Sequence, residues 1–415
     1  MTRRRVVVTG LGCITPAGND VASTWQALLA GRSAVTYLPR LASEGCRCRI
    51  GAEVRGFDPA RLGFRQPVDR LGRGSQFALA AAQEAHRDAR LADPALNLAH
   101  CGTIVGTGIG DLAETVRQTQ NYLEQGIQAI HPRCAPRVMP NAAAAHVALE
   151  FGFRGPSFAT ASGCAAAGHA IGLAARLIRS GDAEVMVAGG TEDISCALYV
   201  AAFDALHAVS TRNDEPEKAS RPFDRRRDGF VVGEGAGMLV LEELDHARRR
   251  GASIYAELAG VGMTSEARHL TTPDPRGDAA AAAMAGALHD AGRRPADVHY
   301  VNAHGTSTPL NDRMETAAVR KALGRHASRV CVSATKSMIG HSIGASAAVG
   351  LIAAVLSIRD RVVHPTINYE DPDPACDLDY VPNRARELDV DVALVNAFAF
   401  GGHCVSLLVA RLAGA

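Results

Sequence analysis

The sequence predicts an α/β protein built around a buried sheet. Short, β-branched apolar runs that end in glycine or lead into a loop alternate with alanine-rich stretches of helical spacing. Strands of continuous apolar character are typical of sheets covered on both faces, and small alanine faces let helices pack closely against them. The chain has 415 residues, of which 47% are hydrophobic, and this is enough for a large core and excludes wholesale disorder.

The same pattern repeats along the chain. Strands are predicted, in order, at residues 4–10, 103–108, 183–190, 236–244, 330–336 and 392–402. Helices are predicted at residues 165–181, 277–292 and 346–360. The series runs once to about residue 253 and again to the end, which predicts two similar halves, 1–253 and 254–415. The irregular, arginine-bearing segment at about 191–232 is interpreted as an insertion into the first half.

The charges are balanced, because 44 Lys and Arg face 43 Asp and Glu. A net charge of +1 gives no global field for nucleic acid or an anionic membrane. The segment 220–230 gathers Arg221 and Arg225–Arg227 as either a local anion site or a solvated turn, and the turn is favoured. Val6–Val8 is too short for a signal-peptide core, and Ala345–Ile358 falls short of the roughly 20 residues of a membrane span. We expect a cytoplasmic protein without a membrane span.

The cysteines and glycines give no cofactor signature. The ten cysteines form no pair of CxxC motifs, so cytosolic free thiols are expected and no metal site. Cys46 and Cys48 form only a weak CxC. The glycines of 10–12 and 106–110 follow strands but lack the third glycine of a dinucleotide-binding loop.

Cys164 is the first candidate for chemistry. It follows the stretch SFATASG (157–163) and immediately precedes the predicted helix. A helix N-terminus favours thiolate and lowers the thiol pKa, which suits a nucleophile. A small core cysteine in a tight turn is an equally supported interpretation of this motif alone.

Two histidine motifs favour the functional interpretation. His304 lies in NAHGTST (302–308) and His341 lies in KSMIGH (336–341), each after a predicted strand. Open α/β sheets place their sites in such loops. Two loop histidines and a helix-start cysteine form a set suited to acyl transfer through a thioester.

Over essentially its whole length the sequence resembles the β-ketoacyl-acyl carrier protein synthases of the KAS II type and the related type II polyketide ketosynthases. The resemblance is carried by VVVTGLGCITPAGND (6–20), GTGIG (106–110), SGC (162–164), STRNDEPEKASRPFDRRRDGFVVGEGAGMLVLEE (210–243), NAHGTSTPLND (302–312), TKSMIGH (335–341) and NAFAFGG (396–402). It implies a thiolase-like fold, in which duplicated βαβαβαββ halves stack as α-β-α-β-α layers, and a dimer.

The resemblance implies decarboxylative condensation. Cys164 would carry the acyl group, and its backbone N–H and that of Phe400 would form the oxyanion hole. His304 and His341 would bind the malonyl thioester carbonyl and promote loss of CO2. The resulting two-carbon unit would attack the acyl-Cys164 thioester and extend a fatty-acyl or polyketide or polyene chain. Phe400 would also gate the site.

Further roles follow from the same resemblance. Thr306 and Thr308 match hydroxyls that hold a phosphopantetheine arm, which the acyl carrier protein supplies, so no tightly bound cofactor is expected. Lys336 matches a lysine that supports the histidine loop. Ile109 matches a side chain that limits the acyl pocket and Phe203 matches a pocket wall, although ordinary apolar packing explains both equally well.

The chain departs from the family pattern at several positions. Ser162-Gly163-Cys164 replaces Thr-Ala-Cys and is closer to the Thr-Gly-Cys of polyketide ketosynthases, and Ala167 replaces a glycine. Gly350 stands where the family carries a glutamate that pairs with the lysine. His403-Cys404 replaces Thr-Asn. Because of these departures, the family pattern does not predict which groups surround Lys336 or the geometry of the late steps.

Three functions therefore stay in competition. An active condensing enzyme is favoured because all three catalytic positions are present. Acyl transfer to an oxygen or nitrogen nucleophile without decarboxylation is the alternative that the departures leave open. A non-catalytic subunit like a chain-length factor is disfavoured by Cys164. The expected partners are an acyl carrier protein and either a second copy or a chain-length-factor-like subunit.

Overall fold

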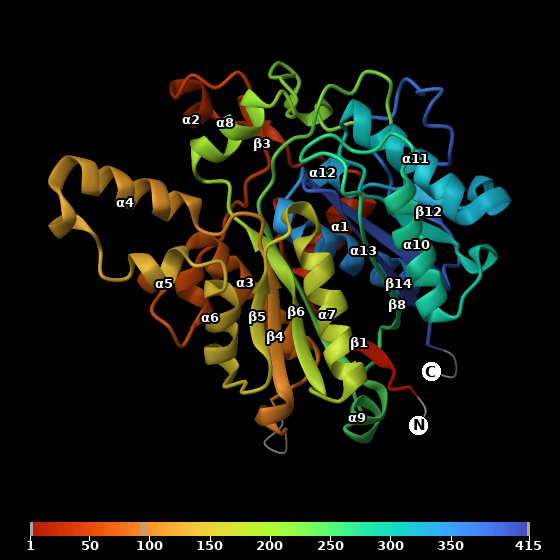
Figure 1. Ribbon diagram of the computed structural model, residues 1–415, viewed down its shortest axis with the longest axis horizontal. Helices are drawn as coiled ribbons and strands as arrows, with labels where there is room; N and C mark the ends of the chain where they lie inside the picture. Colours follow the sequence, from red (N-terminus) through yellow and green to blue (C-terminus); the bar gives the residue numbers. More distant parts are fainter. Residues whose placement is uncertain (1–2, 93–95, 413–415) are drawn as a thin grey trace.

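The computed structural model describes residues 3–92 and 96–412 as one layered α/β unit (Figure 1). The main strands are β1 (Val6–Ile14), β4 (Cys101–Gly106), β5 (Ser157–Thr160), β6 (Val185–Glu192), β7 (Gly235–Glu243), β8 (Ala256–Ser265), β9 (Tyr300–Asn302), β10 (Cys331–Ser333), β13 (Val392–Ala399) and β14 (His403–Ala410). Two small ribbons pair β2 (Thr36–Tyr37) with β3 (Ile50–Gly51) and β11 (Val362–Val363) with β12 (Arg386–Glu387).

Helices cover the sheet and connect its strands. They are α1 (Val21–Leu29), α2 (Pro39–Ser43), α3 (Arg73–Asp88), α4 (Leu112–Gln125), α5 (Cys134–Val138), α6 (Ala142–Phe151), α7 (Ala166–Ser180), α8 (Ala197–Ala205), α9 (Leu244–Arg249), α10 (Asp278–Ala291), α11 (Pro309–Leu323), α12 (Lys336–Ile339) and α13 (Ser346–Asp360). The predicted strands and the three predicted helices are all present, with ends that differ by a few residues.

The strand order shows the duplication. The strands pair in the order β10-β9-β13-β14-β8-β1-β7-β6-β4-β5. In each half the second, third and fourth strands along the chain are parallel, the fifth runs antiparallel to them, and the first pairs antiparallel with the fifth. The halves meet through two antiparallel residue pairs of β1 and β8. The predicted duplicated fold is confirmed, while a division into two units at residue 253 stays a proposal, because the sheet continues across it.

Two helices form the middle layer between the halves. Helix α7 contacts β4 and β6 of the first half and β14 of the second, whereas α13 contacts β13 and also β7. A Cβ atom at Gly168 would lie 2.4 Å from Val405 Cγ1, and one at Gly172 would lie 2.4 Å from Met263 Cε. These two glycines therefore let α7 approach the opposite half closely. The outer layers are α3 with α6 and α10 with α11.

One described segment, Ile343–Asp360, has the length and the mean hydropathy (1.6) of a membrane-crossing helix. Within the fold 89% of it is buried, because it is the central helix α13 with the turn that precedes it. Its apolar character is therefore explained by packing between two sheets. The apolar run predicted from the sequence, Ala345–Ile358, is shorter than this helical segment by two residues at each end.

The arginines of the segment 220–227 are structural. Arg221 is only 1% exposed, and its guanidinium donates to Asp224 and Glu370 at 3.0 Å each. Arg227, also buried, donates to Asp373 at 2.9 Å. Both sequence interpretations, an anion site and a solvated turn, are wrong for these two residues, because acidic partners from distant loops neutralise them in the interior.

We predict that Arg221→Met lowers the free energy of unfolding by roughly 3 to 5 kcal/mol, because the buried carboxylate of Asp224 loses its buried guanidinium partner. The control is Arg225→Met, since Arg225 is 62% exposed and meets Asp371 at 3.3 Å at the surface. That change should cost no more than about 1 kcal/mol. Urea unfolding of both variants measures the difference, and equal effects would contradict the structural role of Arg221.

Candidate active site

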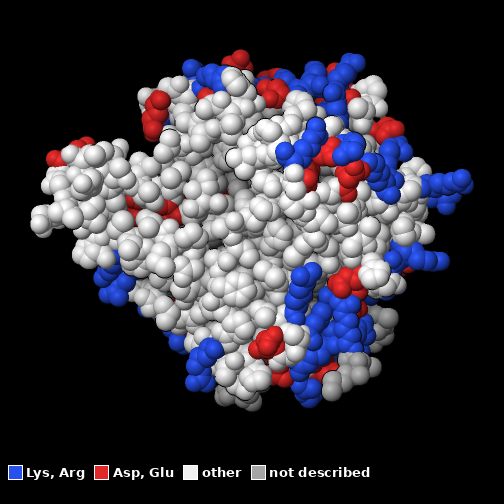
Figure 2. Space-filling view, viewed as in Figure 1, with Lys and Arg blue, Asp and Glu red and all other residues white. Residues whose placement is uncertain are grey.

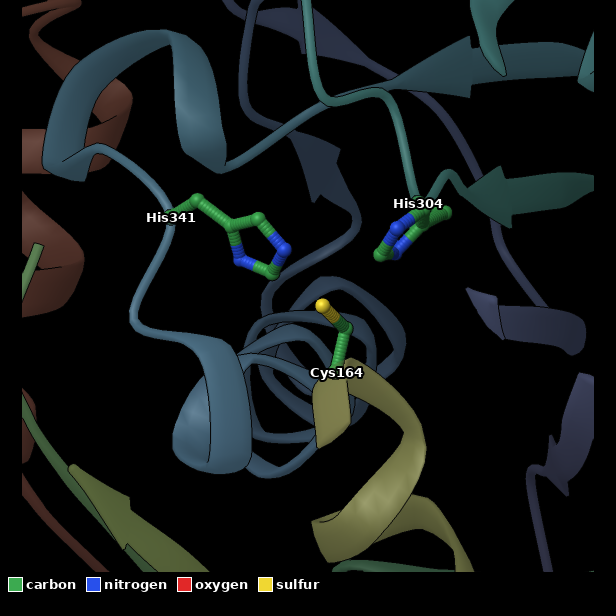
Figure 3. A group of neighbouring side chains, drawn as sticks. All are labelled: Cys164, His304 and His341. Atoms are coloured by element: carbon green, nitrogen blue, oxygen red, sulfur yellow. The ribbon is translucent and has the colours of Figure 1, made fainter. Parts of the chain in front are cut away.

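Cys164 lies where the first half turns into the middle layer. The short 3₁₀ helix η5 (Gly163–Ala165) connects the region after edge strand β5 to α7. Gly163 has φ +56°, a left-handed conformation that favours glycine, and this turn places the thiol at the start of the helix. Figure 3 shows Cys164 pointing at His304 and His341.

His304 comes from the loop after β9 and is 3% exposed. The loop is held by Glu315 of α11, whose two carboxylate oxygens accept the backbone N–H groups of His304 and Gly305 at 2.8 Å each. Asn396 donates to the same carboxylate at 3.1 Å. The imidazole Nδ1 is buried and has no hydrogen-bond partner among residues 3–92 and 96–412. The residue is thus fixed through its backbone, and no neighbouring group determines which ring nitrogen carries the proton.

His341 comes from the loop after α12 and is fixed through its ring. The backbone N–H of Ile343 donates to its Nδ1 at 3.2 Å, and Ser346 Oγ lies 2.8 Å from the same atom. Because Nδ1 accepts, the proton of the neutral ring lies on Nε2. In the described part of the chain Nε2 is buried without a partner. His341 therefore presents a free N–H donor to the cavity.

The three side chains converge. The Sγ atom of Cys164 and one ring nitrogen of each histidine all lie within 4.8 Å of one another. The two imidazole centroids are 5.3 Å apart, and the angle between the ring planes is 84°. Cysteine and histidine at such distances also resemble a metal-ligand set. However, the tautomer of His341 offers a proton rather than a lone pair to the site. The arrangement is thus better suited to hydrogen bonds with a substrate oxygen.

Burial controls the protonation of the site. It raises the pKa of the Cys164 thiol to about 12, and Lys336 offsets only part of this effect. The prediction that the helix N-terminus gives Cys164 a lowered pKa is therefore wrong, because desolvation of the thiolate outweighs it. Burial, together with the charge of Lys336, lowers the pKa of both histidines well below the usual value. The resting site holds a thiol and two neutral imidazoles.

Lys336 begins α12 and is 4% exposed. Burial lowers its pKa, and the charges of Glu315, Cys164 and Asp312 oppose this shift. The lysine ion pairs of the described residues belong to Lys218 and Lys321, so no carboxylate lies within 4.0 Å of the Lys336 ammonium. A Cβ atom at Gly350 would lie 2.6 Å from Asn302 Oδ1, so this position has no room for the family's glutamate. Glu315 supplies the main countercharge instead.

The thiol opens into a cavity of about 380 Å³. Of the predicted site residues, its lining includes Cys164, His304, His341, Thr306, Thr308, Phe203 and Phe400. Phe400 lies in the β13–β14 turn and is 39% exposed, and the two threonine hydroxyls are 3.0 Å apart. Lys336 lies behind the lining. Ile109 is 46% exposed and lies outside the cavity of the single chain.

Sequence reasoning missed the carboxylates that hold the loops. Besides Glu315, Glu192 accepts the backbone N–H groups of Gly108 at 2.7 Å and Gly344 at 3.0 Å, the latter three residues after His341. Burial raises the pKa of Glu192 to about 7. The available signal was an acidic residue directly after the apolar strand VMVAGGT, where a buried carboxylate needs partners.

Family comparison fits this geometry. Residues 3–247 match the β-ketoacyl synthase N-terminal domain and residues 255–370 match the β-ketoacyl synthase C-terminal domain. The chain belongs to the β-ketoacyl synthase family. The predicted family, the predicted enzyme class and the thiolase-like fold are thereby confirmed.

Known relatives resemble the synthase from end to end. The 3-oxoacyl-acyl-carrier-protein synthase 2 of Synechocystis sp. is 47% identical over 407 residues, which cover 98% of both chains. A type II PKS ketosynthase, solved in complex with its acyl-carrier protein and bound to the hexaketide, has a TM-score of 0.93 and 35% identity, and the match covers 99% of this chain and 100% of that one. The ishigamide ketosynthase/chain length factor has a TM-score of 0.92 and 36% identity, with the same coverage.

We predict that alkylation of Cys164 by iodoacetamide accelerates about tenfold per pH unit from pH 7 to pH 9, because the thiolate fraction grows in this way below a pKa of about 12. Peptide mass mapping measures the rate at this residue. Lys336→Met should slow alkylation most near pH 7, because the ammonium lowers the thiol pKa, and this difference should shrink above the lysine pKa of about 8. A plateau below pH 8 would contradict the protonated resting state.

Proposed function

We propose that this synthase condenses malonyl-acyl carrier protein with an acyl group held on Cys164 and so lengthens a fatty-acyl or polyketide chain by two carbons. The observation that carries the proposal is one cavity holding a thiol, a fixed N–H donor on His341 and a second imidazole on His304. An intact Cys164 in this setting argues against a non-catalytic subunit. Transfer to an oxygen or nitrogen nucleophile remains the alternative outcome of the test below.

In the first step Cys164 Sγ attacks the carbonyl of the acyl thioester, and the bond to the pantetheine sulfur breaks. The backbone N–H groups of Cys164 and Phe400 stabilise the oxyanion. A thiol with a raised pKa needs a proton acceptor as it attacks. His304 serves this role, because no hydrogen bond fixes its tautomer, and it passes the proton to the departing pantetheine sulfur. His341 is already committed as a donor.

In the second step the malonyl thioester oxygen accepts hydrogen bonds from His341 Nε2–H and from His304. The bond to the carboxylate carbon breaks, CO2 leaves, and the electron pair remains as an enolate that these donors stabilise. The enolate carbon attacks the acyl carbonyl on Cys164. A carbon–carbon bond forms, the bond to Sγ breaks, and the thiolate takes a proton from solvent.

The phosphopantetheine arm belongs to the carrier protein, and we propose that Thr306 and Thr308 hold it. Both residues line the cavity together with His304, and their hydroxyls lie 3.0 Å apart. Thr308 also caps α11 by accepting from Asn311 N–H at 3.3 Å, which fixes its position. No tightly bound cofactor is needed for either step, because the reacting groups are all thioesters.

We propose that the synthase works as a dimer, with a second copy or a chain-length-factor-like subunit. The arm that carries α4 and α5 exposes apolar side chains at Ile109, Tyr122, Leu123, Ile127 and Met139. Figure 2 shows few charges on this lobe, at the left. Edge strand β5 exposes Phe158 beside it. A partner on this face would bring Ile109 into the acyl pocket.

A cytoplasmic location fits ten free thiols.

We predict that His341→Ala lowers CO2 release from malonyl-acyl carrier protein by about 10²- to 10³-fold, as loss of one oxyanion donor does. Acylation of Cys164 should stay close to the wild-type rate, because His341 takes no proton in that step. His304→Ala should slow both half-reactions. Intact-protein mass and trapping of CO2 measure them separately.

Cys164→Ala is the control, since it should remain unacylated by acyl-acyl carrier protein. Release of CO2 at the wild-type rate from His341→Ala would overturn its role. Wild-type protein that acylates Cys164 but passes the acyl group to an amine or alcohol without CO2 release would establish the alternative function.

A further inference from the structure

Tyr199 on α8 is a buried phenol that the mechanism above does not use. Its side chain is fully buried, and its hydroxyl has no hydrogen-bond partner among the described residues. Burial raises the pKa of this phenol well above its usual range, so the hydroxyl keeps its proton. Buried polar groups in folded proteins are normally paired, and an orphan needs an explanation. Tyr199 therefore offers an unused hydrogen-bond donor.

The donor lies on the acyl side of the nucleophile. Tyr199 belongs to one apolar cluster with Ile194 and Ile343, and both Cys164 and Phe203 pack against that cluster. The Tyr199 and Phe203 rings meet edge to face at 5.6 Å. Cys164, Phe203 and Ile343 line the cavity, whereas Tyr199 lies behind them. An acyl chain on Cys164 that passes between Phe203 and Ile343 would therefore contact this ring.

The nearby carboxyl does not satisfy the hydroxyl. Glu192 and Cys164 both raise the pKa of Tyr199 through their charges, and Glu192 also does so as a nearby acceptor for the phenol. Its Oε2 accepts the backbone N–H groups of Gly108 and Gly344, its Oε1 lies 3.4 Å from Thr107 Oγ1, and neither oxygen is placed to complete a hydrogen bond with the phenol. A saturated acyl chain packed against Tyr199 would leave the hydroxyl unpaired. An oxygen on the chain would pair with it.

We propose that Tyr199 is a specificity-determining residue that donates a hydrogen bond to an oxygen of the acyl chain on Cys164, so that the synthase favours short oxygenated chains such as 3-oxoacyl groups over saturated chains of the same length. This inference rests on the proposed function, because it needs an acyl-Cys164 intermediate. A site with a buried hydrogen-bonding group discriminates strongly against an analogue that lacks the matching atom. Ile194 and Ile343 belong to the same apolar cluster and would limit the chain to a short one.

The test compares two matched pairs of acyl groups, butanoyl with 3-oxobutanoyl and hexanoyl with 3-oxohexanoyl, each carried on acyl carrier protein. The rate of Cys164 acylation is followed by intact-protein mass in wild type, Tyr199→Phe and the exposed control Tyr37→Phe. In wild type and in the control we expect the 3-oxo chain to react roughly 10- to 100-fold faster. In Tyr199→Phe the two rates should converge.

Thermal unfolding supplies a second measurement. Tyr199→Phe removes only the unpaired hydroxyl, so its melting temperature should equal or exceed that of wild type. A marked fall would show that the hydroxyl has a partner inside the protein and would overturn the inference. Equal rates for both members of each pair in wild type would also overturn it, while leaving condensation intact. Absence of both acylation and CO2 release in wild type would instead refute the proposed function.

Discussion

The chemistry of this synthase depends on desolvation of its reacting groups where the two halves of the fold meet. The first half supplies Cys164 at the start of α7, and the second half supplies His304 and His341. At this meeting point both histidines are buried and Cys164 is half-buried at the cavity. Removing water disfavours every charged form, so the thiol keeps its proton and both imidazoles stay neutral. Neutral imidazoles are good donors to an enolate oxygen, and the thiol reacts only when a base and a thioester are both present.

Desolvation also explains why carboxylates hold the loops. A buried carboxylate must be paired with donors, and the backbone N–H groups of irregular loops are donors without a strand partner. Glu315 satisfies His304 and Gly305, while Glu192 satisfies Gly108 and Gly344. Each buried carboxylate therefore obtains the hydrogen bonds that it needs, and each one fixes the position of a loop. The catalytic loops are thus fixed without an added positive charge. A further positive charge would lower the pKa of the two histidines even more.

The sequence predicted the repeated strand and helix series and the three converging residues because these depend on local pattern and motif. It missed β8, because glycines at 260 and 262 interrupt the apolar pattern, and it missed its partner β14, because the strand predicted at 392–402 ends just before His403. Those glycines are needed because a Cβ atom at Gly262 would lie 1.9 Å from Ala283 O. It gave the wrong sign for the pKa of Cys164, because the helix N-terminus is visible in sequence and the depth of burial is not. The partners of Arg221 were hidden for a similar reason, since Glu370 lies 149 residues away.

The glycine at position 350 affects both the hydrogen bonds beside it and the charges around Lys336. Asn302 occupies the space beside Gly350 and donates to Tyr300 Oη at 2.9 Å, which in turn lies 2.7 Å from Ser333 Oγ. This buried cluster links the ends of β9 and β10, the two strands that lead into the histidine loops, without any ionised group. A glutamate at 350 would bring a negative charge into it. With that charge absent, Glu315 is the main countercharge to the ammonium of Lys336, so the same carboxylate that fixes His304 also opposes the lowering of the lysine pKa by burial.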